Sequence, residues 1–198
     1  MKSIFYRYPL IYDLGIQFIY LNGLKILKNI VGRRKSVFEP GCGYGRMKKY
    51  LYPDCDYSGV DLNKAFIEYG KKRNRDISVG NALDEQRYRE SDTILLCDII
   101  HHLNGQKNEL VSLAVKFARE KVVIIEPLFV DIATRSNSLS RAIGKFMAVM
   151  DADGFNEIDQ WLSKDEYMEL FRSMKELHHI KKMKMQNFRN HIFVEMYV

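Results

Sequence analysis

Three glycines at alternate positions carry the first chemical signal in the sequence. Gly41, Gly43 and Gly45 lie within "FEPGCGYGRM", residues 38–47, directly after an apolar, β-prone run and directly before a helical pattern. Glycine lets a chain turn tightly and brings its backbone against a ligand, and the helix N-terminus that follows supplies unpaired N–H groups. The pattern therefore predicts a ligand-binding turn between a strand and a helix.

The place of the third glycine separates two classes of cofactor, nicotinamide dinucleotides and S-adenosylmethionine. The dinucleotide fingerprint requires its third glycine at the position of Arg46, where it lets the helix and the strand pack closely. The third glycine of this chain is Gly45 instead. The spacing therefore counts against a dinucleotide.

Acidic, amide and imidazole side chains follow the later apolar segments. Asp61 ends "YSGVD", Asn81 follows "DISVG", and "DTILLCD" ends at Asp98, shortly before His101 and His102. In doubly wound sheets, ligands bind at the carboxyl ends of the strands, where the strand order reverses. We therefore expect these side chains to lie near the glycines, along one edge of a sheet.

Strands alternate with helices from Ser36 to Glu126, and this alternation sets the fold class. The predicted strands are "SVFEPG", "YSGVD", "DISVG", "DTILLCD" and "KVVIIEP", and the apolar run in "DTILLCD" is typical of a strand buried on both faces. Short connections imply right-handed crossovers. We predict an α/β fold: a doubly wound, mostly parallel seven-stranded sheet with helices on both faces, an N-terminal helical cap and a C-terminal antiparallel hairpin.

The remaining segments are interpreted as parts of one domain, residues 1–198. The predicted parts are an N-terminal helical cap (1–33), a cofactor-binding core (36–126), a lid insertion (127–162) and a closing helix with the hairpin (163–198). Apolar residues from Leu139 to Met150 predict a helix in the lid. Ser163 and Glu166 predict a capping box at the start of the closing helix.

"FEPGCGYGRM" resembles the E/D-x-G-x-G-x-G motif of class I S-adenosylmethionine-dependent methyltransferases. The resemblance spans Val37 to Pro127 and continues in order with "GVDLN", "GNALD" and "LLCDIIHHL". The predicted hairpin is also what that fold places at the end of its sheet. The resemblance implies an enzyme that uses S-adenosyl-L-methionine, releases S-adenosyl-L-homocysteine and has no metal site.

The resemblance also implies a set of cofactor-binding residues. The set comprises Tyr12, Glu39, Gly41, Cys42, Gly43, Gly45, Arg46, Asp61, Leu62, Asn81, Ala82 and Asp98. Asp61 would accept both ribose hydroxyls as paired hydrogen bonds, and its alternative role is to cap a helix beside Asn63. Asn81 stands where the family often has aspartate against the adenine amino group, and its amide oxygen can still accept that bond.

The other members of this set are assigned to the two ends of the cofactor. Glu39 would orient the loop and the methionyl end, because a charge at the end of a buried strand needs partners. Tyr12 and Arg46 are candidates for the methionyl carboxylate, and the other interpretation of Arg46 is an exposed arginine in the first helical turn. Ala82 would offer backbone contact, and Leu83 an apolar face, to the adenine ring.

The segment "CDIIHH" is expected to touch the methyl acceptor. Methyl transfer from a sulfonium is an in-line displacement, so the enzyme mainly aligns the nucleophile and, where needed, removes its proton. Asp98 would face the sulfonium or the methionyl ammonium. His101 or His102 could be the general base, since imidazole titrates near neutral pH, but either could instead pack or cap. The other histidines, His178, His179 and His191, are expected on the closing hairpin in structural or surface roles.

Features that the sequence lacks narrow the acceptor. No [DNS]-P-P-[YFW] tetrad follows the fourth strand, which counts against amino methylation of adenine or cytosine, and the basic clusters lack aromatics suited to base stacking. Aromatic residues gather in the cap and the lid, where they favour a small organic or lipid-like acceptor or simply pack two helices. Arg135, Arg141 and Lys145 could receive a phosphate or carboxylate on the acceptor.

Two other classes of function stay open at this point. An RNA or protein methyltransferase would need a contiguous basic surface leading to Asp98. A catalytically idle cofactor-binding or membrane-associated interaction protein could lay its apolar N-terminal helix on an anionic membrane, making a peripheral contact. Basic residues flank that helix at Lys25, Lys28, Arg33 and Arg34. The sequence makes no prediction about oligomeric state.

Composition sets the broad limits of these interpretations. A chain of 198 residues suits one domain with a full core, and 46% hydrophobic with 28% charged residues excludes disordered and fibrous proteins. A net charge of +6 and a pI near 9.1 favour an anionic partner. Three cysteines without a CxxC pair predict reduced thiols, and the absence of a signal pattern or bilayer-length apolar stretch predicts a cytoplasmic protein.

Overall fold

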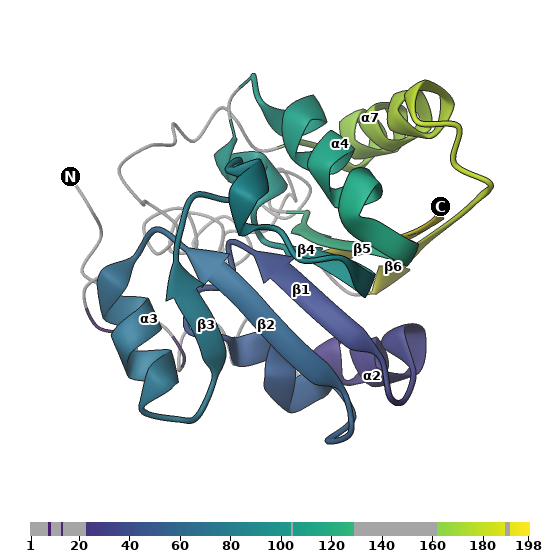
Figure 1. Cartoon of the computed structure of the whole chain (residues 1–198). Helices are drawn as coiled ribbons and strands as arrows, with labels where there is room; N and C mark the ends of the chain where they lie inside the picture. The colour runs from purple at the N-terminus through teal and green to yellow at the C-terminus, as the bar shows by residue number, and fades with distance from the viewer. Residues whose placement is uncertain (1–7, 9–12, 14–22, 104, 129–161, 189–190) are drawn as a thin grey trace, which may run out of the picture.

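The five segments predicted as core strands form the parallel part of one sheet. The structure is a computed structural model that describes residues 8, 13, 23–103, 105–128, 162–188 and 191–198. The parallel strands are β1 (Ser36–Pro40), β2 (Asp56–Asp61), β3 (Asp76–Val79), β4 (Ser91–Cys97) and β5 (Ala118–Pro127). They lie in the order β3-β2-β1-β4-β5 (Figure 1). The order reverses between β1 and β4, so the switch point lies where these two strands end.

The predicted C-terminal hairpin completes the sheet. β7 (His191–Tyr197) pairs antiparallel with β5, and β6 (Lys182–Phe188) pairs antiparallel with β7. The order of all seven strands is therefore β3-β2-β1-β4-β5-β7-β6, and the predicted sheet is confirmed. His191 opens β7 as expected, but placing His178 and His179 on the hairpin was wrong. Helix α7 (Lys164–Leu177) ends directly before these two residues, which lie in the turn between α7 and β6.

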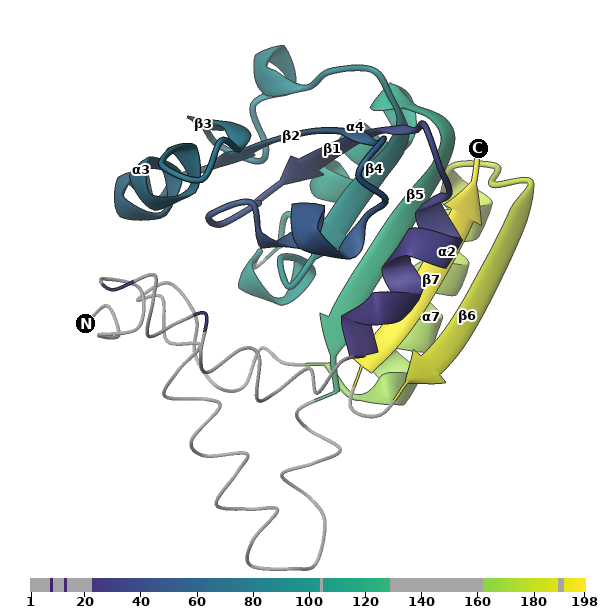
Figure 2. The same ribbon diagram turned by 90° about the horizontal axis from the view of Figure 1, so that it is seen from below.

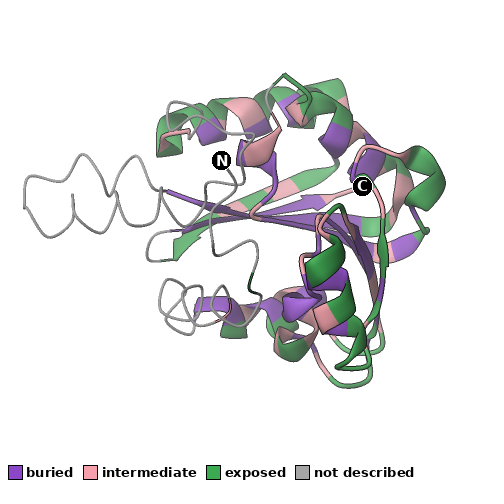
Figure 3. Cartoon of the chain, turned by 90° about the vertical axis from the view of Figure 1, so that its left-hand side faces the viewer, coloured by how far each residue is buried: buried purple, intermediate pink, exposed green. Residues whose placement is uncertain are grey.

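Helices cover both faces of the sheet, also as predicted. α4 (Lys107–Phe117) and α7 lie over one face. The other face carries the 3-10 helix η2 (Gly23–Ile26), α2 (Leu27–Val31), the 3-10 helix η3 (Arg46–Tyr50) and α3 (Lys64–Lys71). Figure 3 shows the sheet edge-on between these two layers, and Figure 2 shows α2 running along β5 and β7.

The central strands supply apolar side chains to both layers. In β4, Ile94 and Leu96 join the core beneath α4 and α7, whereas Leu95 and Cys97 join the core beneath α2 and α3. Successive side chains of a strand point to opposite faces, so a strand covered on both faces must be apolar throughout. This geometry explains the uninterrupted apolar run that predicted β4.

The sequence predicts a helix after the glycines that Pro53 stops, and a second helix that Asn63 caps and that runs to about Asn74. Both helices end earlier in the structure, while the predicted caps at Asn63 and Ser163 are present. The helix after the glycines is the five-residue 3-10 helix η3, followed by an extended residue at Leu51. α3 ends at Lys71, and Asn63 caps it by accepting hydrogen bonds from the second and third residues of the helix. The capping box of Ser163 and Glu166 opens α7, with both reciprocal bonds formed. Local side-chain to backbone bonding therefore marks the starts of α3 and α7, whereas α2 and α4 begin without a side-chain cap.

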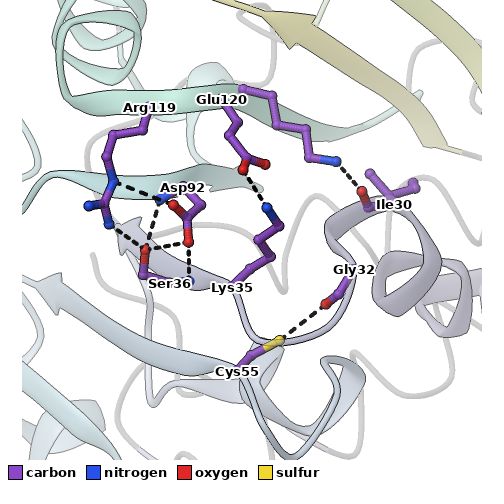
Figure 4. A network of polar contacts seen from close by, with 9 residues as sticks. Ile30, Gly32, Lys35, Ser36, Cys55, Asp92, Arg119 and Glu120 are labelled. Carbon is purple, nitrogen blue, oxygen red and sulfur yellow. Dashed lines mark hydrogen bonds and ion pairs between the residues drawn. The ribbon is translucent and has the colours of Figure 1, made fainter.

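A polar network ties the amino-terminal edge of the sheet together. The backbone N–H and the hydroxyl of Ser36 donate to Asp92 at 2.8 and 2.9 Å, and Arg119 donates to the same hydroxyl at 2.9 Å (Figure 4). Lys35 pairs with Glu120 beside it. These bonds link the starts of β1, β4 and β5 to one another. The predicted ligand site lies at the opposite, carboxyl-terminal edge of the sheet.

Some predicted parts lie outside the described residues. These are most of the N-terminal cap, the predicted lid helix with its basic residues, and Tyr12. Among the residues that are described, no helix combines the length and the apolar character needed to cross a bilayer.

Candidate functional site

The glycine turn joins the end of β1 to the end of β2. The backbone N–H groups of Gly41 and Cys42 both donate to the carbonyl of Val60, at 2.8 and 3.0 Å. Gly41 has a φ of +74°, and a Cβ there would lie 2.3 Å from Cδ1 of Ile99. A side chain at this position would therefore be strained by the left-handed backbone and would force the Ile99 side chain to shift. Cys42 is a buried thiol beneath the turn, and burial raises its pKa, which favours the neutral form.

Gly43 differs from Gly41 in what surrounds it. Its φ of +56° is left-handed, but a Cβ at Gly43 would meet only Phe66, at 3.6 Å, an ordinary contact distance. Its N–H donates at 2.8 Å to Oδ2 of Asp61. A Cβ on Gly45 would lie 3.3 Å from the Arg75 side chain, which is a tight contact. Of the three glycines in the motif, Gly43 is therefore the one with free space where a Cβ would be.

Asp61 connects the glycine turn to the start of α3. Its Oδ2 accepts from Gly43, and its Oδ1 accepts from the backbone N–H of Asn63 at 2.7 Å. Each carboxylate oxygen has two lone-pair sites, so each retains one acceptor position. Burial raises the pKa of Asp61 above its ordinary value in spite of these bonds. The cap of α3 is the Asn63 side chain, so Asp61 is held at the end of β2 without capping the helix.

The segment after β3 lies at the same edge. Leu62 is 65% exposed beside Asp61, and Ala82 is buried. The side-chain oxygen of Asn81 accepts from the backbone N–H of Leu83 at 3.0 Å, and the carbonyl of Ala82 accepts from the Tyr88 hydroxyl at 2.7 Å. The backbone N–H of Gly80 donates to the carbonyl of Asp61 at 3.1 Å, so this segment starts beside the end of β2, and its assignment to adenosine stays a prediction.

Glu39 is a buried carboxyl at the end of β1, with 2% of its surface exposed. The hydroxyl of Tyr57 donates to it. Burial raises the pKa of Glu39 well above its usual range, and the nearby charges of Asp98 and Asp61 add to this, while the Tyr57 bond and Arg46 oppose it. The partner that a buried acid requires at this position is therefore a tyrosine from the neighbouring strand.

Arg46 is buried at the start of η3, with 5% exposed, so the interpretation as an exposed first-turn arginine was wrong. Its Nη2 donates to the Tyr50 hydroxyl at 3.2 Å, and its Nε lies 3.5 Å from Oδ1 of Asp13. The hydroxyl of Tyr44 also donates to Asp13, and Lys49 lies 3.6 Å from it. Asp13 was not singled out in the sequence, and it joins the N-terminal segment to η3.

The loop after β4 contains the three predicted catalytic residues. Asp98 has a φ of +51°, and its N–H donates to the carbonyl of Ile125 at 2.9 Å. A 3-10 helix, η5 (Ile100–His102), follows. The ring of His101 lies 4.2 Å from that of His102, centroid to centroid. The charge of His102 is one of the influences that lower the pKa of Asp61, after its two backbone hydrogen bonds, which places this loop beside the end of β2.

Glu126 is a buried carboxyl beside the predicted catalytic loop that the sequence analysis did not single out. It lies in β5, is fully buried, and contacts Nδ1 of His101 at 2.6 Å. The sequence did carry a signal, because the acid of "KVVIIEP" ends an apolar strand just as Glu39 does. A buried acid at such a position needs partners, and the same reasoning applied to Glu39 would have found Glu126.

Among the described residues, no three His, Cys, Asp or Glu side chains gather closely enough to hold a metal ion. A cavity of about 190 Å³ lies over β2 and β3, lined among others by Ser58, Ser78, Arg87 and Tyr88. None of the predicted site residues lines this cavity, although its lining residues Val60 and Tyr88 bond to the glycine turn and to Ala82.

Comparison with solved structures identifies the architecture. A possible histamine N-methyltransferase from Thermotoga maritima, described as S-adenosylmethionine-dependent, superposes with a TM-score of 0.67 at 17% identity, over 98% of this chain and 97% of that one. The chain has the class I methyltransferase fold. The plantazolicin methyltransferase BamL, solved with S-adenosylhomocysteine, gives a TM-score of 0.67 at 14% identity, over 98% and 92% of the two chains.

A third similar structure belongs to a longer protein. An O-methyltransferase family protein from Burkholderia thailandensis has a TM-score of 0.68 at 12% identity, covering 94% of this chain and 58% of that one. This chain therefore spans little more than half of that protein's length. No family model matches the sequence, and no curated protein matches it.

Proposed function

We propose that this protein transfers a methyl group from S-adenosylmethionine to a small organic or lipid-like acceptor. The observation that carries the proposal is the Asp61 carboxylate. It sits at the end of β2, oriented by the backbone N–H groups of Gly43 and Asn63, with an acceptor position left on each oxygen. A pair of adjacent hydroxyls, such as those of ribose, could donate one hydrogen bond to each of these oxygens.

The surrounding residues fit the nucleoside part of the cofactor. Gly43 presents backbone with room for a neighbouring group. Leu62 is exposed beside Asp61, and the amide of Asn81 lies on the next strand end, so an apolar face and a hydrogen-bonding group are both available for a base. We assign Asp61 to the ribose hydroxyls and Leu62, Asn81 and Ala82 to the adenine.

The opposite side of the site would hold the reacting groups. S-adenosylmethionine, when bound, supplies a methyl group on a positively charged sulfur. Asp98 places a carboxyl at the end of β4, near those of Glu39 and Asp61. We assign His102 as the general base where the acceptor must lose a proton, because His101 is 1% exposed and its Nδ1 is engaged by Glu126.

A small acceptor agrees with the charges at this edge. The charges of Asp98 and Asp61 both raise the pKa of Glu39, after its burial, so acidic groups gather around this position. A concentration of acids repels nucleic-acid phosphates, so it disfavours an RNA substrate. The similar structures named above include proteins described as histamine and plantazolicin methyltransferases, and their acceptors are small molecules or peptides, which supports the same class here.

The compartment belongs to the same proposal. Cys42, Cys55 and Cys97 are all buried thiols, and none forms a disulfide. Reduced cysteines of this kind are the rule in the cytoplasm, where glutathione and thioredoxin maintain thiols. We therefore assign the protein to the cytoplasm.

The test is calorimetric titration of the purified chain with S-adenosylmethionine, S-adenosylhomocysteine and NADH. We expect saturable binding of the first two, with micromolar affinity of the order of −8 kcal/mol, and none of NADH. Absence of binding by both sulfur compounds would overturn the proposal and favour an idle interaction protein. NADH binding with comparable affinity would instead reassign the glycine turn to a dinucleotide.

A further inference from the structure

Glu126 makes contacts with four groups and is fully buried. Its Oε1 accepts from the backbone N–H groups of Ile99 and Ile100, at 3.0 and 2.8 Å. Its Oε2 lies 2.6 Å from Nδ1 of His101 and accepts from the Tyr167 hydroxyl at 3.1 Å. The carboxyl therefore joins β5 to the loop after β4 and to α7.

These contacts use the whole bonding capacity of the side chain. A carboxylate offers about four acceptor positions, so Glu126 has none left for a ligand. Burial alone would raise its pKa, but the His101 charge and the hydrogen bonds outweigh burial and lower the pKa. Glu126 is thus an ionised, saturated group, and any influence it has on the site must pass through the residues that it holds.

The residues held by Glu126 are those that face the site. Ile99 packs its side chain against Gly41, so the backbone bond to Ile99 also fixes the wall of the glycine turn. The preceding residue, Asp98, has a left-handed φ of +51°, a conformation that costs free energy and must be maintained by its surroundings. The His101 ring lies against the His102 ring, with the centroids 4.2 Å apart and the planes tilted by 38°, and His102 is near enough to influence Asp61.

We propose that Glu126 is the positioning residue of this site: it fixes the loop of residues 98–102 and, through the Nδ1–H of His101, the orientation of the His102 ring. The inference rests on the proposed function for its catalytic meaning, since His102 is there the assigned base. Its structural content is independent of that function. Hydrogen bonding of one histidine nitrogen by a buried acid sets the tautomer and the orientation of the ring.

The isosteric variant Glu126→Gln distinguishes the roles of the two carboxylate oxygens of Glu126. Glutamine keeps one carbonyl oxygen, which can still accept from Ile99 and Ile100, so the loop backbone retains its bonds. It replaces the other oxygen by an NH₂ group, which is a donor and cannot accept a hydrogen bond from a protonated Nδ1 of His101. We therefore expect Nδ1 of His101 to lose its proton in this variant, which leaves a neutral ring protonated on Nε2, and the adjacent His102 ring to shift with it.

The measurement is ¹⁵N–¹H NMR of the histidine side chains in the wild type, Glu126→Gln and the matched control Tyr167→Phe. The control removes one bond to the same oxygen without placing a donor against His101. We expect a protonated, exchange-protected Nδ1 on His101 in the wild type and in the control. In Glu126→Gln we expect Nδ1 of His101 to be unprotonated and the resonances of His102 to move.

Each outcome decides the proposal. Unchanged His102 resonances in Glu126→Gln would overturn it, even if His101 changes. If that variant does not fold, the NMR spectrum of the wild type tests the proposal by itself. An unprotonated or freely exchanging Nδ1 on His101 would then overturn the proposal. A calorimetric titration with S-adenosylhomocysteine, expected to show less than about a tenfold loss in Glu126→Gln, tests the proposed function separately, since the NMR arm uses no cofactor.

Discussion

Two regions of the carboxyl-terminal edge are built by different means. The β1–β2 corner, residues 39–63, is tied mainly by backbone N–H groups: those of Gly41 and Cys42 donate to the Val60 carbonyl, and that of Gly43 donates to the Asp61 carboxylate. The β4–β5 corner, formed by residues 98–102 with Glu126 and Tyr167, is made of side chains from three separate elements. The first corner tolerates few changes of backbone shape, whereas the second depends on charge and protonation.

The largest expected effect tests the rigidity of the β1–β2 corner. Gly41→Ala would add a methyl group 2.3 Å from the Ile99 side chain at a left-handed φ. We expect a loss of about 3 kcal/mol in the free energy of unfolding, from overpacking and backbone strain together. Urea unfolding measures it. The matched control is Gly43→Ala, where only the strain of about 1 kcal/mol applies, and equal losses for the two variants would contradict our account of the turn.

The corresponding test uses pH and a histidine beside the β4–β5 corner, since Glu126 and His101 both influence its protonation. His191 opens β7, is 3% exposed, and has a pKa lowered to about 4 by burial; Arg46 and His101 lower it further, while Glu126 raises it. The unfolded chain therefore binds more protons between pH 6.5 and about 4, and the protein loses stability as the pH falls through that window. The shift corresponds to about 3 kcal/mol.

The variant His191→Gln removes this titration. We expect unfolding free energies measured across the same pH window to fall less steeply in the variant than in the wild type. The slope is the decisive quantity, because the substitution also changes packing at every pH. Parallel slopes would show that His191 does not titrate as its burial requires.

A smaller expected effect, on cofactor affinity, tests the role of the β1–β2 corner in binding. Asp61→Asn keeps one acceptor oxygen but replaces the other with a donor and removes the charge, so one of the two paired bonds to a diol is lost. We expect the affinity for S-adenosylhomocysteine to fall at least about tenfold, since a charge-assisted bond contributes about 1.5–3 kcal/mol. Calorimetry measures this, and unchanged affinity would place the ribose elsewhere.

The smallest effect separates folding from binding at the same corner. Asn63→Ala removes the side chain that caps α3 but keeps the backbone N–H that bonds to Asp61. We expect about 1 kcal/mol less stability with unchanged cofactor affinity. Thermal unfolding and calorimetry on the same preparation provide both quantities. A parallel loss of affinity would mean that the start of α3 itself contributes to the site.

How much the sequence could predict differs between the two corners. The glycine turn, Asp61 and the Asn63 cap follow from residues that are neighbours in the chain, where local rules apply. The burial of Arg46 could not be predicted, because it depends on Asp13, which is brought to η3 by tertiary folding. The pairing of His101 with Glu126 also joins residues far apart in the chain, and no local pattern encodes such a contact.

The sequence by itself determined the order of strands and helices, the apolar strands of the sheet and the polar residues at its carboxyl edge, because hydrophobic periodicity and turn chemistry are local properties. Only the tertiary structure decided which of those polar groups are buried, paired or open. Glu39 and Glu126 both end apolar strands, yet burial raises the pKa of one, and an imidazole partner lowers that of the other. The partners that a buried charge finds are set by the packing of distant elements, and that packing exists only in the folded chain.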